Sequence, residues 1–410
     1  MQTHGFLLSA EKGKPVNRTS PQTFLLAMAF VMPFVFSTWM ALLNNFVIEK
    51  AAFTGAEIGL LQSIREVPGF LAFTAIYVLL FVKEQRFAIL SIGVMSAGVA
   101  ATGYFPTEYG LYLTTLIMSI GFHYFETTQQ SLTLQWLDKK ESAHFLGKSL
   151  AVKSFGSLLA FGGIWLLMEW FEVSYQTTYL LAGGIGLVVV IFLWFGFPMF
   201  EQPATQTKKL VLRKNYWLYY MLTFLSGARR QIFVVFAGFM MVEKFGYSVG
   251  EISLLFGVNY VFNLLFAAKI GKWVGVIGER KALTLEYVGL ILVFVGYAFV
   301  TNPHIAAGLY IIDHMFFALA IAIKTYLQKI ADQKDIAATA SVSFTINHIA
   351  AVVIPALLGL VWLYSSTLVF LIGAGFALCS LVASQLIPNE PTELIPTKLA
   401  KSVSTEKEYV

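Results

Sequence analysis

The sequence predicts an all-α integral membrane protein in which twelve transmembrane helices form two parallel six-helix halves. Three observations lead to this fold class. First, 57% of the 410 residues are hydrophobic and only 12% are charged, whereas soluble domains contain about 25% charged residues. Second, the hydrophobic residues form twelve long, continuous stretches. Third, part of the first half of the chain recurs in the second half, 194 positions later.

Each hydrophobic stretch is long enough to cross a bilayer as a helix, which takes about 20 residues. Strands of a membrane barrel would instead be alternating segments of about ten residues, so helices are favoured. The first six expected helices cover residues 23–47, 57–82, 87–105, 110–136, 146–170 and 175–199. The second six cover residues 216–242, 248–273, 282–301, 304–328, 337–363 and 366–387.

Hydrophilic segments divide the chain into two expected bundles, at residues 21–200 and 216–388. A polar linker at 201–215 joins them, and polar tails cover residues 1–20 and 389–410. Because residues 1–20 lack the apolar core of a signal peptide, we expect the first hydrophobic stretch to remain in the protein as a span. The net charge of +5 is small and scattered, so we expect no nucleic-acid partner.

The distribution of Lys and Arg predicts the orientation. If the N-terminus is cytoplasmic, 20 of the 28 basic residues fall in inside segments, and two, Lys50 and Lys244, fall in outside loops. The other six lie within hydrophobic stretches. Cytoplasmic loops are rich in Lys and Arg, so we expect both termini, both tails and the linker in the cytoplasm. The chain is then a multi-pass protein of the cell (inner or plasma) membrane.

The internal repeat is carried by two segments, FVIEKAAFTGAEIGLL at 46–61 and MMVEKFGYSVGEISLL at 240–255. Glu49 and Lys50 recur as Glu243 and Lys244. The same offset of 194 pairs three further charged loop residues with partners of the same type, namely Arg86 with Arg280, Asp138 with Asp332, and Lys140 with Lys334. The offset moves six helices onto six, an even number, so both halves have the same orientation in the membrane. This arrangement is a parallel repeat about an axis along the membrane normal.

Two parallel six-helix halves joined by a cytoplasmic linker resemble the major facilitator superfamily. That family has a loop signature, G-x-x-x-D-x-x-G-R-[KR], after its second and eighth helices. Residues 271–281 read GKWVGVIGERK, in which Gly271, Gly278 and Arg280 fit the signature and two positions differ. In the first half only Arg86 remains of it. The resemblance implies that Arg86 and Arg280 help to hold the halves together on the inside.

The resemblance also implies which helices matter for transport. Helices 1, 4, 7 and 10 of the family line the central cavity, and helices 2, 5, 8 and 11 flank it. Proton-coupled drug antiporters of the family carry a Gly-Pro and then a Gly-Gly in the fifth helix. Here that segment reads SFGSLLAFGGIW, with Gly162-Gly163 but without the Gly-Pro. This difference disfavours a drug antiporter.

Charged side chains within the expected helices are candidates for function. Such a charge costs about 2.5–3.5 kcal/mol on insertion scales, so it usually faces protein or a water-filled cavity. His123, Glu126 and Gln130 share one face of the fourth helix, since they lie three and four residues apart. We interpret Glu126 and His123 as a proton-coupling site and Gln130 as a substrate ligand. The alternative is a polar pair that ties this helix to a neighbour.

Two adjacent arginines lie in the seventh helix. Arg229 and Arg230 diverge by about 100° and cannot point to one spot. We expect one of them to bind an anionic group of the substrate, as a guanidinium can, and the other to pair with a carboxylate such as Glu126 or Asp313. The alternative is that both make structural ion pairs. Asp313, in the tenth helix, is a candidate for proton coupling or for pairing with an arginine.

The remaining candidates have weaker indications. Trp39 and Asn45 in the first helix are expected substrate contacts, although aromatic residues also mark membrane interfaces. Pro68 removes a backbone hydrogen bond and can kink the second helix. Lys324 lies eleven residues after Asp313, on the same expected face, and can snorkel to the headgroups. A gating or structural role is expected for Arg65, Glu66, Pro68, Arg86, Lys153, Arg280, Lys324 and His348.

No hydrolytic, redox or P-loop motif occurs in the sequence, so we expect no catalytic residues, no cofactor and no metal. Uphill transport would then use an ion gradient. We therefore predict a secondary active transporter that moves a small organic solute, anionic or zwitterionic, by alternating access coupled to protons. Two alternatives stay open: proton-coupled efflux of drug-like or toxic compounds, and an integral-membrane enzyme that modifies lipids. The expected partners are the solute, protons and the lipid bilayer, and the expected oligomeric state is a monomer.

Overall fold

The computed structural model describes residues 20–137, 139–201, 212–332 and 336–399. Most of the expected linker and tails therefore lies outside the described residues, as do Asp138 and Lys334. The described chain is helical, without strands. We call helical segments that follow one another without a long loop one pass. The described helices then form twelve passes, and each overlaps one of the twelve expected hydrophobic stretches.

The first six passes come from seven α-helices and two irregular turns. They are α1 (Pro21–Ala51), α2 (Gly55–Phe70) with η1 (Ala72–Thr74) and α3 (Ala75–Leu79), α4 (Glu84–Thr102), α5 (Glu108–Trp136), α6 (Lys139–Trp165) with η2 (Leu166–Trp170), and α7 (Tyr175–Gly196). The second pass is thus broken shortly after Pro68, which lies in the last turn of α2.

The second six passes follow the same order. They are η3 (Lys214–Tyr216) with α8 (Trp217–Ile232), η4 (Phe233–Ala237) and α9 (Gly238–Glu243), α10 (Val249–Ile277), α11 (Glu279–Phe299), α12 (Pro303–Phe317) with η5 (Ala318–Ala320) and α13 (Ile321–Ile330), α14 (Ile336–Trp362), and α15 (Ser366–Ser384). Among the described residues, ten helical spans are long and apolar enough to cross a membrane. The passes at 55–79 and 108–136, which contain Glu66 and Glu126, are the two outside this set.

The repeat is visible at the helix ends. α2 and α10 begin 194 positions apart, and each begins with a capping box. The backbone N–H of Thr54 donates to Glu57 over 2.7 Å, and that of Ser248 donates to Glu251 over 2.9 Å. Such boxes satisfy backbone donors that the first turn of a helix leaves free. The recurring Thr/Ser-x-x-Glu pattern is therefore a pair of matching helix starts.

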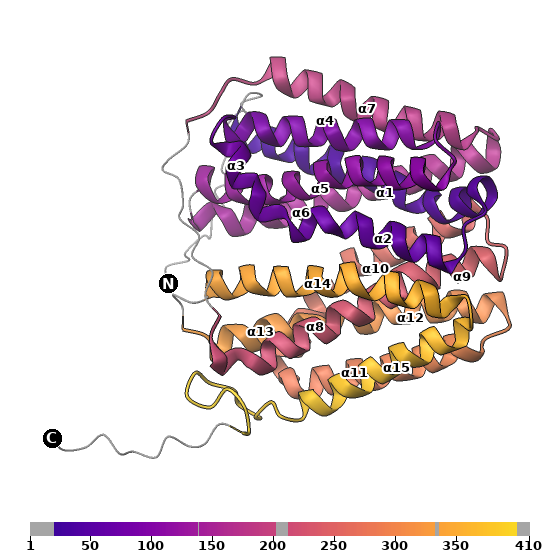
Figure 1. Cartoon of the computed structure of the whole chain (residues 1–410). Helices are drawn as coiled ribbons and strands as arrows, with labels where there is room; N and C mark the ends of the chain where they lie inside the picture. Colours follow the sequence, from indigo (N-terminus) through magenta and orange to yellow (C-terminus); the bar gives the residue numbers. More distant parts are fainter. Residues whose placement is uncertain (1–19, 138, 202–211, 333–335, 400–410) are drawn as a thin grey trace, which may run out of the picture.

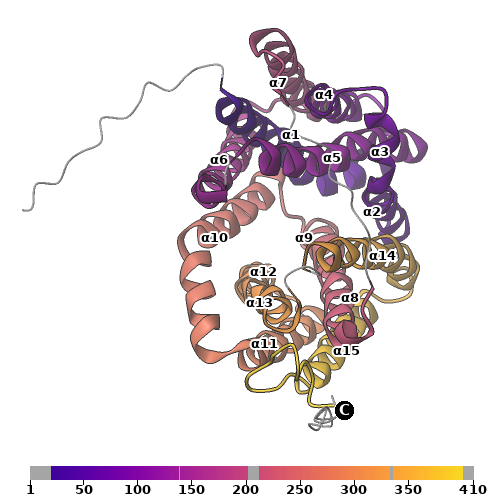
Figure 2. The same ribbon diagram turned by 90° about the vertical axis from the view of Figure 1, so that its left-hand side faces the viewer.

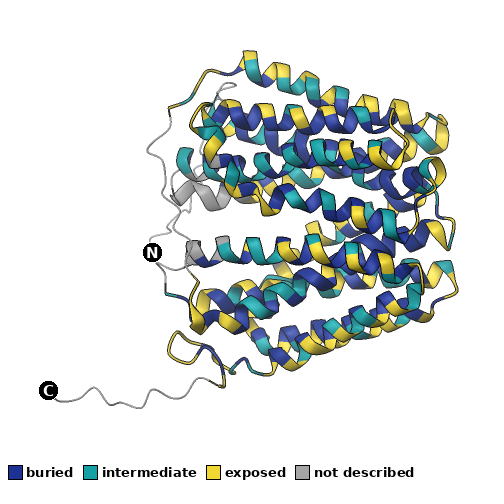
Figure 3. Ribbon diagram, viewed as in Figure 1, coloured by how far each residue is buried: buried dark blue, intermediate teal, exposed yellow. Residues whose placement is uncertain are grey.

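The two halves form two bundles that lie side by side. α1–α7 occupy the upper part of Figures 1 and 2, and α8–α15 the lower part. Between the halves, α2 packs against α14 and α6 packs against α10. Many large apolar side chains are exposed, among them Phe81, Phe195 and Val276, and exposed residues are frequent along the outward-facing sides of the helices in Figure 3. Exposed apolar faces of this kind suit contact with lipid.

Hydrogen bonds connect the two halves at the end of the molecule where α1 and α9 end. Asn45 donates from Nδ2 to the backbone oxygen of Tyr247 over 2.7 Å. Glu169 accepts hydrogen bonds from Ser248 Oγ (2.6 Å) and from the backbone N–H of Gly250 (2.9 Å). These three hydrogen bonds between the halves all lie at this end. The bundle is therefore closed here.

Candidate functional site

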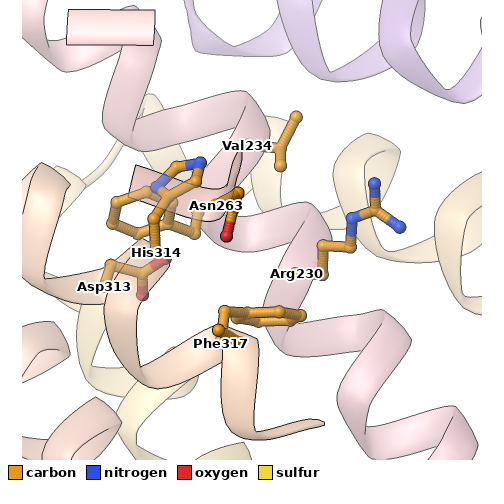
Figure 4. Close-up of a pocket in the computed structure, with 8 residues that line it drawn as sticks. Arg230, Val234, Asn263, Asp313, His314 and Phe317 are labelled. Atoms are coloured by element: carbon orange, nitrogen blue, oxygen red, sulfur yellow. The ribbon is translucent and has the colours of Figure 1, made fainter. Parts of the chain in front are cut away.

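A cavity of about 310 Å³ lies between α8, η4, α10 and α12 (Figure 4). It is lined by Arg230, Phe233, Val234, Asn263, Asp313, His314, Phe317 and Ala318. Two aromatic rings, an amide, a carboxyl group, an imidazole and a guanidinium thus border one space. An apolar lining with a few convergent polar groups is typical of small-molecule sites.

The helices beside this cavity depart from regular α-helical geometry. η4 is a π-helical turn that directly follows α8 and provides Phe233, and η5 is a 3₁₀ turn that provides Ala318. Neither turn contains proline or glycine, so the sequence has no helix-breaking residue from which either turn could be predicted. Short π segments within helices often occur at functional sites. The local backbone therefore supports this cavity as a site.

Arg230 is the cation of the cavity. Its side chain is exposed, it makes no ion pair with a described residue, and its guanidinium points away from Asp313 and His314 in Figure 4. Electrostatic interactions connect Arg230 and Lys153 to Glu126 of α5. Arg230 also interacts electrostatically with His314 of its own half. Glu126 and Lys153, in the other half, are half-buried.

Arg229 has a different environment, as the divergence of adjacent helical residues predicts. It is fully buried, and its Nη2 atom lies 3.6 Å from Oε1 of Glu286, which is also fully buried. Its guanidinium lies over the ring of Tyr287 at 4.3 Å, and its Nε donates to the backbone oxygen of Leu225. Asp313, a buried carboxyl group whose Oδ1 has no hydrogen-bond partner, also interacts with Arg229 electrostatically. Two buried acids therefore share one arginine.

A second polar cluster lies between the halves. Glu66 of α2 forms an ion pair with the adjacent Arg65 at 2.5 Å. Its other oxygen lies 3.6 Å from Nε2 of His348 on α14, and the rings of His348 and His123 are 5.2 Å apart. All four side chains are buried. Among the described residues, Glu66, His123 and His348 are the group whose ligand-type atoms lie close enough together to hold a metal ion.

The residues expected to contact substrate do not gather in the cavity of Figure 4. Trp39 is fully buried and packs against Phe36. Asn45 is buried at the closed end, where its amide holds Tyr247, so in this conformation it binds protein rather than solute. Gln130 is exposed on α5, two turns from the buried His123. Arg230 is the expected substrate ligand that lines the cavity.

The other expected positions divide between the two halves. Arg86 stacks over the ring of Trp194 at 5.0 Å, and Arg280 donates to Asn389. Both contacts lie within one half, so neither arginine connects the halves in this conformation. The 3₁₀ turn η5 lies between Asp313, which is buried, and Lys324, which is exposed as a snorkelling lysine would be.

Sequence reasoning missed three residues of these sites. Glu286 is a lone carboxylate within the hydrophobic stretch 282–301, and the cost of a buried charge that singled out Asp313 applies equally to it. Asn263 lies in an apolar stretch and lines the cavity. Gly69 has no side chain to signal its role, yet a Cβ atom there would collide with His348 and press on His123.

Comparisons with known proteins agree with this fold. A family model described as Major Facilitator Superfamily matches residues 22–355 and 219–406. No curated protein matches the chain. A mutant of the nucleoside transporter NupG has a similar structure, with a TM-score of 0.75 and 16% identity over 89% of this chain and 99% of that one. A bacterial homologue of the human lysosomal transporter Spinster, inward-facing and unoccupied, has a TM-score of 0.71 and 14% identity over 91% of this chain and 98% of that one.

Proposed function

Because the chain belongs to the Major Facilitator Superfamily, we propose that it is a secondary active transporter of a small organic anion or zwitterion. It moves this solute across the cytoplasmic membrane by alternating access, coupled to protons. Family membership places the protein among transporters and supports transport over the lipid-modifying enzyme. The solute class and the coupling rest on the residues of the two halves.

Arg230 carries the proposal for an anionic group. It is exposed at the cavity, has no ion-pair partner among the described residues, and lies beside the aromatic rings of Phe233 and Phe317. A guanidinium binds carboxylate or phosphate oxygens in a forked geometry, and the rings suit an apolar or planar body. An organic anion satisfies both features, whereas a cationic drug satisfies only the second.

Four basic side chains lie within the helices near the solute path, Arg65, Lys153, Arg229 and Arg230, but two of them are already paired. Arg65 pairs with Glu66, and Arg229 pairs with Glu286. Arg230 and Lys153 then remain, opposed by Glu126. The excess is a single positive charge, which favours a monoanion or a zwitterion over a multiply charged anion.

Proton coupling is supported by the group around Arg229. Glu286 and Asp313 are both buried and share the charge of one guanidinium. The group of three is therefore neutral when it holds one proton. An unpaired buried charge is costly, so proton uptake or release here is coupled to how water and solute reach Asp313 at the cavity wall.

The direction of opening follows from the expected topology. The loops at 51–54 and 244–248 lie at the closed end and are expected outside, since both termini are expected in the cytoplasm. The end that is closed in this conformation is then the outer one. Efflux of drug-like compounds stays the second candidate, because the aromatic rings beside Arg230 also suit an apolar compound.

The proposal is tested with purified protein in proteoliposomes under an imposed pH gradient. A panel of labelled anions, zwitterions, cations and neutral solutes is offered, and accumulation is measured with and without a protonophore. We expect accumulation of an anion or zwitterion that the protonophore abolishes. If only cations accumulate, the anionic site is wrong, and if no solute moves under any gradient, transport itself is refuted.

A further inference from the structure

The cluster between the halves joins three helices through side chains with metal-binding chemistry. Glu66 comes from α2, His123 from α5 and His348 from α14. One ligand-type atom of each lies within 4.8 Å of those of the other two, and all three side chains are buried. The first two residues belong to the N-terminal half and the third to the C-terminal half.

The hydrogen bonds around the cluster direct lone pairs into its centre. Nδ1 of His348 lies 2.8 Å from the backbone oxygen of Phe344. A carbonyl oxygen only accepts, so this nitrogen carries the proton and Nε2 presents a lone pair when the ring is neutral. Nε2 faces a Glu66 carboxylate oxygen at 3.6 Å, too far for a hydrogen bond. Nδ1 of His123 is buried without a hydrogen-bond partner. Acceptor atoms of the three side chains thus converge within 4.8 Å of one another.

We propose that Glu66, His123 and His348 bind a divalent transition-metal ion of the Zn²⁺ type between the two halves. Two imidazoles and one carboxylate are an established ligand set for such ions. Ligand atoms about 2.0–2.2 Å from a tetrahedral zinc lie about 3.3–3.6 Å apart, and the pair of Glu66 and His348 is already at 3.6 Å. The bond from His348 to Phe344 is the outer-shell contact that orients a ligating imidazole.

Gly69 makes the room for this arrangement. A Cβ atom at this position would collide with the His348 ring and come within 2.7 Å of Cε1 of His123. Both imidazoles therefore pack directly on the α2 backbone, one turn after Glu66. Glycine is required at this position because the two imidazoles approach the backbone closely, and not because of a turn.

Arg65 opposes the metal and limits its affinity. It occupies one oxygen of Glu66 at 2.5 Å, which leaves the other oxygen as a single ligand. Its positive charge repels a dication at close range. We therefore expect metal binding to become tighter when Arg65 is replaced by a neutral residue. A misfolded variant would bind the metal more weakly, so tighter binding could not result from misfolding.

A bound ion would also influence the conformation of the transporter. Because its ligands come from both halves, the ion favours the conformation in which α2, α5 and α14 meet, which is the one described here. A ligand shifts a conformational equilibrium by its difference in affinity for the two states. Zn²⁺ at this site would therefore slow alternating access.

Binding is tested on tag-free protein in detergent. Zn²⁺ titration calorimetry gives stoichiometry and affinity, and Co²⁺ gives an optical spectrum that reports nitrogen and oxygen ligands. We expect one ion per chain. Binding should be at least about 100-fold weaker in Glu66→Gln, His123→Gln and His348→Gln, since even changes to outer-shell contacts of a metal site cost 10–100-fold in affinity. Binding should be unchanged in the control His304→Ala, whose imidazole is exposed outside the cluster. Mg²⁺ should not compete.

Two further variants separate a site from a folding effect. Gly69→Ala should abolish binding although every ligand remains, and Arg65→Gln should tighten it about tenfold or more. Thermal unfolding without metal confirms that each variant is folded. If the wild type binds no Zn²⁺ at micromolar concentration, or if the three ligand variants bind as the wild type does, the metal site is refuted. Binding is read without transport, so this result stands whether or not a solute is found.

Discussion

Nη2 of Arg229 lies 3.6 Å from Oε1 of Glu286, and neither side chain is exposed to solvent. The pair joins α8 to α11, and Arg230, the next residue of α8, lines the cavity. Two adjacent arginines therefore have separate tasks. One holds the C-terminal bundle together, and the other is free to meet a ligand.

We expect Arg229→Met to destabilise the protein far more than Arg230→Met. Removing one partner of a buried ion pair leaves the other charge unpaired and costs about 3–5 kcal/mol. Thermal unfolding in detergent measures the difference, and Arg230→Met serves as the matched control at the neighbouring position. The double variant Arg229→Met/Glu286→Met should regain most of the lost stability, because it leaves no unpaired charge from this pair. Equal unfolding temperatures for the two single variants would contradict this assignment.

Arg230→Ala should weaken binding of the anionic solute about ten- to hundredfold, because a hydrogen bond to a charged group contributes about 1.5–3 kcal/mol. Arg230→Lys should recover part of this loss, since it restores the charge but not the forked geometry. Tryptophan fluorescence or calorimetry with the solute identified in proteoliposomes provides the measurement. If Arg230→Ala binds anions as well as the wild type does, the guanidinium is not in the site.

Asp313→Asn should uncouple transport from protons. The amide keeps the size of the side chain but leaves Glu286 as the sole acid beside Arg229, so this group no longer needs a proton to be neutral. We expect proton-driven accumulation to disappear while exchange of labelled for unlabelled solute continues. Loss of both activities would instead indicate a binding or structural role, and retention of accumulation would exclude Asp313 from coupling.

Glu126 and Lys153 should tune anion binding in opposite directions. Glu126→Gln removes a negative charge near Arg230 and should tighten anion binding about three- to tenfold, and Lys153→Met should weaken it similarly, since charges in water interact by about 1 kcal/mol at close range. In the wild type, protonation of Glu126 at lower pH has the same effect as the Gln substitution. Anion affinity should thus rise as the pH falls, and this rise should shrink in Glu126→Gln. A rise of equal size in both proteins would exclude Glu126 as its source.

The fold could be predicted because membrane helices are recognisable by their length and hydrophobicity, and because charged loop residues such as Lys50 and Lys244 recur at one fixed offset in the repeat. The divergence of Arg229 and Arg230 follows from helix geometry alone. The pairing of Glu66 with His348 could not be predicted, since it depends on how α2 and α14 meet across the halves. The break at η5, which separates Asp313 from Lys324, has no proline or glycine to signal it.

The closed end provides a test of alternating access. A Cβ atom at Gly59 of α2 would collide with the backbone oxygen of Pro355 on α14, and a Cβ atom at Gly359 would lie 2.5 Å from the backbone oxygen of Gly55. These glycines let the two helices touch backbone to backbone, and close-packed interfaces do not absorb an extra side chain. Gly59→Leu should therefore push the halves apart at this end.

Spin labels at Lys50→Cys and Tyr364→Cys, both exposed positions, report that separation once the single native cysteine, Cys379, is replaced by serine. We expect the distance between the labels to increase in Gly59→Leu, since the closed state loses stability and the state open at this end becomes populated. Gly184→Leu is the control, because a Cβ atom there meets no other atom within 4 Å. An unchanged distance in Gly59→Leu would mean that α2 and α14 do not form the seam that opens.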